Sequence, residues 1–63
     1  MEKFGFLYSG QEGLDMAVIE GEDVFKALGI FARKHEGAEL IRICEGAAIV
    51  QWQAFVLGLD SGA

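Results

Sequence analysis

The sequence predicts a small α+β domain: an antiparallel β-sheet with one amphipathic helix on one face, in the order ββαββ. Three observations predict this fold class. A helical apolar stripe occupies the middle of the chain, apolar runs flank it on both sides, and turns rich in glycine and acidic residues separate the runs. With 63 residues the chain forms one domain, 1–63, which hides only about 60% of the surface that its unfolded chain exposes.

The first two strands are predicted at 3–8 and 14–20, where apolar residues alternate. The segment SGQEG between them is typical of a turn. A five-residue connection over 9–13 predicts three apolar pairs on one face: Tyr8 with Leu14, Phe6 with Met16, and Phe4 with Val18.

The helix is predicted within 21–37. Its apolar stripe has the helical spacing, and its members are Val24, Phe25, Leu28, Phe31, Ala32 and His35. Acidic residues lie in the first turn and basic residues in the last turn, which is the order that the helix dipole favours. Gly21 or Asp23 suits the N-cap, and Gly37 suits the position just after the helix.

Two further strands are predicted at 38–44 and 47–57, joined by a two-residue turn, Glu45-Gly46. The segment 47–57 is apolar on both sides, so periodicity alone permits a second helix there as well. Its β-branched and aromatic residues favour a strand. The tail, 58–63, is predicted to fray.

One helix covers only one side of such a sheet, so the other side is predicted to be an exposed apolar surface. A contiguous patch of this kind is typical of a binding surface, whereas scattered apolar residues are ordinary. The predicted partner-binding residues on this outer sheet face are Leu7, Ile19, Leu40, Ile49 and Phe55.

The net charge of −5 and the isoelectric point near 4.5 disfavour direct binding to nucleic acid and favour a basic protein partner. A second group of predicted partner-binding residues, the acidic end, comprises Glu12, Asp15, Glu20, Glu22 and Asp23. The alternative is a solvated surface, in which Glu22 and Lys26 form an ordinary i,i+4 pair.

The composition offers little catalytic chemistry. Cys44 and His35 are the only cysteine and the only histidine, and His35, Glu36 and Glu39 lack a recognised metal-ligand spacing. The sequence therefore predicts no enzyme, no catalytic residues, no metal and no cofactor. The apolar run 47–59 is too short to cross a bilayer, and the first ten residues lack the pattern of a secretory signal, which together predict a cytoplasmic protein.

In size, acidity, absence of cofactor motifs and predicted architecture, the whole chain resembles the small inhibitors encoded by phages and other mobile elements, including anti-CRISPR proteins. The resemblance implies a non-enzymatic inhibitor that binds a protein partner and occludes a basic surface of a nucleic-acid-handling complex in the host cytoplasm. It assigns no functional positions. The alternative is a structural or regulatory homo-oligomer whose sheets stack through the outer face.

Overall fold

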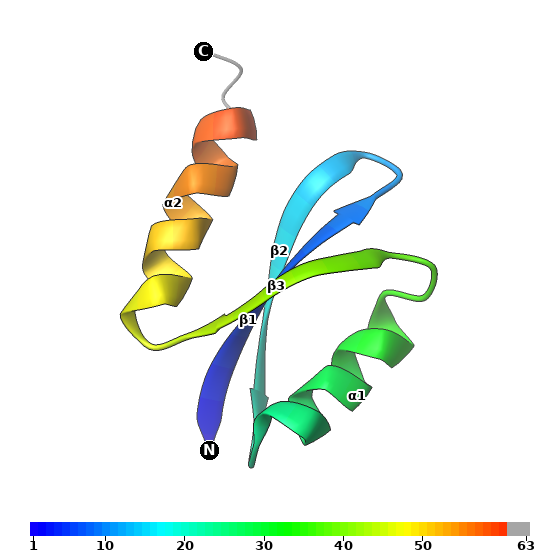
Figure 1. Ribbon diagram of the computed structural model, residues 1–63, viewed down its shortest axis with the longest axis vertical. Helices are drawn as coiled ribbons and strands as arrows, with labels where there is room; N and C mark the ends of the chain where they lie inside the picture. Colours follow the sequence, from blue (N-terminus) through cyan, green and yellow to red (C-terminus); the bar gives the residue numbers. More distant parts are fainter. Residues whose placement is uncertain (61–63) are drawn as a thin grey trace.

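The computed structural model describes residues 1–60, and its elements follow the order ββαβα. They are β1 (Glu2–Gly10), β2 (Gly13–Gly21), α1 (Val24–Lys34), β3 (Glu39–Glu45) and α2 (Ala47–Asp60). The three strands form one antiparallel sheet in the order β2-β1-β3, so β1 is the central strand. Figure 1 shows α2 on the left and α1 on the right of the sheet.

The main core lies between the sheet and α1. Phe6 of β1 is fully buried, and its ring stacks on that of Phe31 with 5.0 Å between the centroids. Phe4, Ile19 and Ala27 complete this buried cluster. Aromatic side chains bury large apolar areas and dominate the stability of a small core. The Phe6–Phe31 pair is therefore the main contact that holds α1 on the sheet.

Of the signals predicted for the ends of α1, the Asp23 cap is confirmed, whereas no acidic residue lies in the first turn and the helix ends at Lys34, with His35 as its C-cap. The Asp23 carboxylate accepts a hydrogen bond from the backbone N–H of Lys26 at 2.9 Å, which makes Asp23 the N-cap. At the other end the N–H of His35 donates to the carbonyl of Phe31, and Gly37 adopts a positive φ of 84° in the turn that follows.

The apolar stripe of α1 is only partly as predicted. Phe31 is buried, whereas Phe25 is 79% exposed and Ala32 is also exposed. Ala27, which was outside the predicted stripe, is fully buried instead. The side of α1 that faces the sheet is therefore rotated slightly about the helix axis from the predicted side. The reason is that α1 packs on β2 and β1 and not on β3.

The register of the first hairpin differs from the prediction by one residue. The loop has two residues, since Gly10 pairs with Gly13, and Phe6 consequently faces Ala17 rather than Met16. A shift of one residue moves every side chain of a strand to the opposite face. Ala17 and Ile19 therefore face α1, while Met16 and Val18 face the other side of the sheet.

The segment predicted as a fourth strand is a helix, so the order ββαββ is wrong. The turn at Gly46 lies where it was predicted, with a φ of 62°, but it leads into α2 rather than back along the sheet. Ile49, Trp52 and Val56 have helical spacing and are the residues that α2 turns inward. Packing of this stripe overrides the β-propensity of the segment.

α2 covers the face of the sheet opposite α1. Leu7 and Cys44 are buried there together with Ile49 and Val56 of the helix. Of the tail that was predicted to fray, residues 58–60 belong to α2, and 61–63 lie outside the described residues.

Gly5 permits the close approach of α2 to β1. A Cβ atom on Gly5 would lie 2.8 Å from the Cys44 sulfur and 3.3 Å from Cγ1 of Ile49, and closer still to the methyl group of Met16. The Met16 methyl group ends a flexible, half-buried side chain and can move, whereas Cys44 and Ile49 are buried and have less room. Gly29, on the exposed side of α1, has nothing within 4 Å of such an atom.

We therefore expect opposite effects from two glycine-to-alanine substitutions. Gly5→Ala should lower the free energy of unfolding by about 1–3 kcal/mol through overpacking. Gly29→Ala should raise it by about 0.5–1 kcal/mol, because alanine favours a helix interior. Chemical denaturation monitored by circular dichroism measures both. A neutral Gly5→Ala variant would contradict the close packing of Cys44 and Ile49 around Gly5.

Candidate protein-binding surfaces

The predicted outer sheet face is not an exposed surface. Leu7, Ile19 and Ile49 are at most 8% exposed, Leu40 is half-buried, and only Phe55 is open, at 51%, on α2. Four of these five residues therefore belong to the interior or its margin. The prediction that these residues form an exposed sheet surface is therefore wrong.

Each of these residues departs from the prediction for a specific reason. α2 covers Leu7 and contributes Ile49 to the buried side of that contact. The register shift in the hairpin turns Ile19 toward α1. A β-bulge adds Ile41 between the partners of Leu7 and Tyr8, which brings Leu40 to the α1 side of the sheet.

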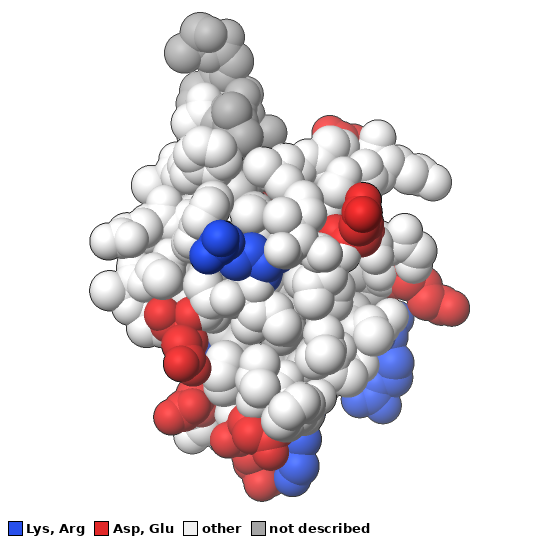
Figure 2. All heavy atoms as spheres, viewed as in Figure 1, with Lys and Arg blue, Asp and Glu red and all other residues white. Residues whose placement is uncertain are grey.

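The structure divides the predicted acidic end into two groups. Glu12 and Asp15 lie at the β1–β2 turn, whereas Glu20, Glu22 and Asp23 lie at the other end of β2, roughly 26 Å of extended strand away. Figure 2 shows acidic groups around the hairpin tip and the α1–β3 loop on the right, and again around the N-terminus and the start of α1 at the bottom. Acidic charge therefore gathers at both ends of the sheet.

The first acidic group belongs to a cleft between the hairpin tip and the α1–β3 loop, here called the hairpin cleft. It has a volume of about 650 Å³. Four carboxylates from two separate segments line it, and no lysine or arginine does: Glu12, Asp15, Glu36 and Glu39. Clefts lined by charge of one sign concentrate the field and attract oppositely charged groups.

Aromatic rings line the inner side of the hairpin cleft. Tyr8 and His35 are half-buried, with 4.7 Å between their ring centroids, and His35 stacks on Phe31 at 5.0 Å. Phe31 is also part of the core, so the stack connects the cleft rigidly to the interior. Aromatic faces beside carboxylates suit the guanidinium or ammonium group of a basic side chain.

The pKa of the Tyr8 phenol reflects its burial and the negative charge of the hairpin cleft. Burial raises the pKa of its phenol above the usual 10.0, and the negative charges of Asp15 and Glu12 and a hydrogen bond with Asp15 raise it further. All these causes favour the neutral phenol. At neutral pH Tyr8 is therefore a neutral phenol whose O–H is engaged with the Asp15 carboxylate at the wall of the cleft.

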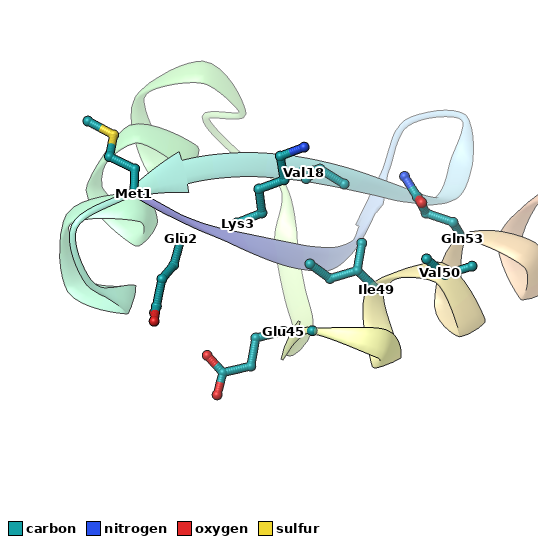
Figure 3. A pocket seen from close by; sticks show the side chains of 9 residues that line it. Met1, Glu2, Lys3, Val18, Glu45, Ile49, Val50 and Gln53 are labelled. Atoms are coloured by element: carbon teal, nitrogen blue, oxygen red, sulfur yellow. The ribbon is translucent and has the colours of Figure 1, made fainter.

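A second cleft lies at the other end of the sheet, where β1 begins and α2 starts. Figure 3 shows this N-terminal cleft, which has a volume of about 880 Å³. Met1, Val18, Ile49 and Val50 provide its apolar lining. Its polar lining is of mixed charge, because Lys3 accompanies Glu2 and Glu45.

The acidic residues near the N-terminal cleft are partly used within the fold. Glu22 forms an exposed ion pair with Lys26 at 3.0 Å, and Asp23 caps α1. Glu20 lies opposite Lys3 in the register of β1 and β2. This end therefore presents a weaker negative field than the hairpin cleft, although its cleft is larger.

Cys44 and His35, the only cysteine and the only histidine of the chain, lie far apart in the fold. Cys44 lies on the α2 face, and His35 stacks with rings on the α1 face, so the two cannot act as a pair. Burial raises the pKa of the Cys44 thiol, which makes the thiol less reactive. Within residues 1–60 no three histidine, cysteine or acidic side chains are grouped to hold a metal ion.

The helices of the described chain are too short and insufficiently apolar to cross a membrane. No protein-family model, curated protein or solved structure matches the chain. The candidate surfaces therefore rest on the geometry of the chain alone.

Glu36 and Glu39 are the residues of the hairpin cleft that sequence reasoning did not connect with Glu12 and Asp15. They are distant from the hairpin in sequence and meet it only because β3 pairs with β1. The available signal was their position at the end of the predicted helix segment and just beyond it, where the chain returns to the sheet.

Titration of Tyr8, the only tyrosine, tests the field of the hairpin cleft. Since its pKa is raised on folding, the folded state holds this proton more tightly, and the associated stability is lost as the pH rises above about 10. Absorbance at alkaline pH should give a midpoint above 10.0, and Asp15→Asn should lower it. A midpoint at or below 10.0 in the folded wild type would contradict a negative electrostatic field at Tyr8 in the hairpin cleft.

Proposed function

We propose that this chain is a non-enzymatic protein-binding inhibitor that occludes a basic surface of a nucleic-acid-handling complex in the host cytoplasm. The observation that carries the proposal is the hairpin cleft, in which four carboxylates gather without a lysine or arginine among the lining residues. Such an arrangement supports binding of a surface rich in arginine or lysine. This is the mode that the resemblance to phage inhibitors of the anti-CRISPR type implies.

Electrostatics supports a protein partner over a nucleic acid. The chain carries a net charge of −5, which repels phosphate groups and attracts the basic surfaces that bind them. Complementary charge of this kind speeds association and makes it dependent on salt. An inhibitor that must find its target before nucleic acid does gains directly from a fast association rate.

The geometry of the cleft supports recognition rather than diffuse attraction. Tyr8 and His35 hold fixed ring positions against Phe31, and the carboxylates approach from the hairpin and from the α1–β3 loop. A planar guanidinium can stack on an aromatic face while its N–H groups donate to carboxylates at its edge. Arginine is therefore the basic side chain that the cleft fits best.

Stacking of two sheets through their outer faces, the alternative that the sequence suggested, has no free surface in this fold. α2 occupies that face and buries Leu7 and Cys44. Self-association would need another surface of the molecule.

The test compares two variants that each neutralise four carboxylates. The cleft variant combines Glu12→Gln, Asp15→Asn, Glu36→Gln and Glu39→Gln. The control variant combines Glu2→Gln, Glu20→Gln, Glu22→Gln and Glu45→Gln at the other end of the sheet, and leaves the Asp23 cap intact. Both variants therefore have the same net charge.

Capture from host lysate, identification by mass spectrometry and a binding titration should recover a basic nucleic-acid-handling complex with the wild type. The cleft variant should bind it at least about fourfold more weakly, since each of the four lost exposed ion pairs is worth about 0.2–1 kcal/mol. The control variant should retain most of the affinity. Equal losses in both variants would indicate attraction by net charge alone, and the assignment to the hairpin cleft would then fail.

A further inference from the structure

The outer edge of β3 is open along the described chain. β3 is the last strand of the sheet, and within residues 1–60 no strand pairs with it on the side away from β1. In an antiparallel pair, every second residue of a strand turns its N–H and C=O groups away from its partner. β3 therefore presents a row of backbone donors and acceptors that another extended strand can pair with.

The surroundings of this edge are largely apolar. α1 packs on β2 and β1 and not on β3, and Ile41 and Ile43 of β3 are 53% and 38% exposed. Figure 1 shows β3 crossing between the two helices, and in the same view in Figure 2 the surface along its path carries few charged groups. An open edge with exposed apolar side chains is a template for a further strand.

A small pocket adjoins the edge, where the end of β3 lies beside the start of α1. It has a volume of about 200 Å³. Phe4, Val24 and Ile43 provide its apolar lining, and Cys44 and Glu45 complete it. In recognition by strand addition, backbone hydrogen bonds supply the affinity and pockets for alternate side chains supply the specificity. The pocket suits one aliphatic side chain of an added strand.

β2, the other edge strand, is less accessible to such pairing. Asp15 and Glu20 are exposed along it, and both helices pack on it. Charged residues on an edge strand disfavour pairing with a further strand. β3 has acidic residues only at its ends, Glu39 and Glu45, and a β-bulge interrupts its first half, so 42–45 is its regular open segment.

The charged groups of β3 define the chemistry of the partner. Arg42 lies opposite Leu7 and therefore on the α2 side, where its guanidinium lies over the Trp52 ring at 5.2 Å from the centroid. Ile43 and Glu45 lie on the α1 side, beside the small pocket. Cross-strand pairs of opposite charge and of apolar side chains stabilise a sheet. The best partner strand therefore places a carboxylate beside the arginine, an aliphatic side chain beside the isoleucine and a basic side chain beside the glutamate.

We propose that β3 receives an extended segment of a partner protein as a fourth strand, antiparallel to β3. Antiparallel pairing is the more stable arrangement per residue. In chain order the segment carries a basic residue, any residue, an aliphatic residue and an acidic residue, which face 45, 44, 43 and 42 in turn. The 63-residue sequence contains no segment of this order, and two chains of net charge −5 repel, so the partner is a different protein.

A titration of the isotopically labelled full chain with a short capped peptide, followed by nuclear magnetic resonance, tests the proposal. The peptide is acetyl-Thr-Lys-Thr-Val-Glu-Val-Thr-amide, in which lysine, the first valine and glutamate follow the order above. Amide shifts should change in 41–45 and at Val24, and alternate amides of β3 should exchange more slowly with solvent. For so short a peptide we expect a dissociation constant on the order of 0.1–1 mM. No change at about 5 mM peptide, or changes centred on β2, would overturn the proposal.

Two N-methylated peptides separate strand addition from attraction between side chains. One is methylated on the nitrogens of lysine and the first valine, and the other on those of the middle threonine and glutamate. The two peptides have the same composition and charge, but only one of them loses the N–H groups that face β3. One peptide should therefore bind at least about tenfold more weakly than the other. Equal binding of the two would overturn strand addition.

Ile43→Thr and Val18→Thr form a matched pair of variants, because both side chains are β-branched, lie on opposite edge strands and are 38% and 39% exposed. Ile43→Thr should weaken peptide binding about threefold to tenfold through loss of the aliphatic contact, and Val18→Thr should leave it unchanged. Circular dichroism establishes that both variants are folded. Equal affinities of the two variants would contradict the proposed register. This inference is independent of the hairpin cleft, so its failure would not decide the proposed inhibitory function.

Discussion

The burial of β1 on both faces is the constraint on which the rest of the structure depends. Phe4 and Phe6 point to α1, while Gly5 and Leu7 point to α2, and all four are buried. A chain of this length cannot form one thick core, so it divides its apolar side chains between two thin layers that share a central strand. Gly5 is required because the second layer leaves no space for a side chain.

Sequence reasoning succeeded where the signals were local. The α1 helix, its Asp23 cap and the turn at Gly46 depend on neighbours in the chain, and the structure has all three. It failed where a choice depended on tertiary packing. The hairpin loop has two residues rather than five, which reverses the faces of β2, and the apolar run 47–57 is a helix because the open side of the sheet needed a cover.

The candidate surfaces also combine features that local sequence indicates with features that only tertiary packing creates. Glu12 and Asp15 were identified from the acidity of the chain, but their association with Glu36 and Glu39 depends on the pairing of β3 with β1. The outer sheet face was inferred from the absence of a second helix and disappears with α2. What lies on that side instead is α2, whose exposed residues mix apolar side chains such as Val50 and Phe55 with Gln51 and Gln53.

The fold thus separates two kinds of surface on a very small body. The two ends of the sheet carry most of the acidic charge, whereas residues 47–59 of α2 include no ionisable side chain. Nuclear magnetic resonance titration of the isotopically labelled chain with an arginine-rich peptide tests this account most directly. Amide shifts should change in 8–15 and 35–39 and not in 47–57, whereas changes centred on α2 or on the N-terminal cleft would contradict it.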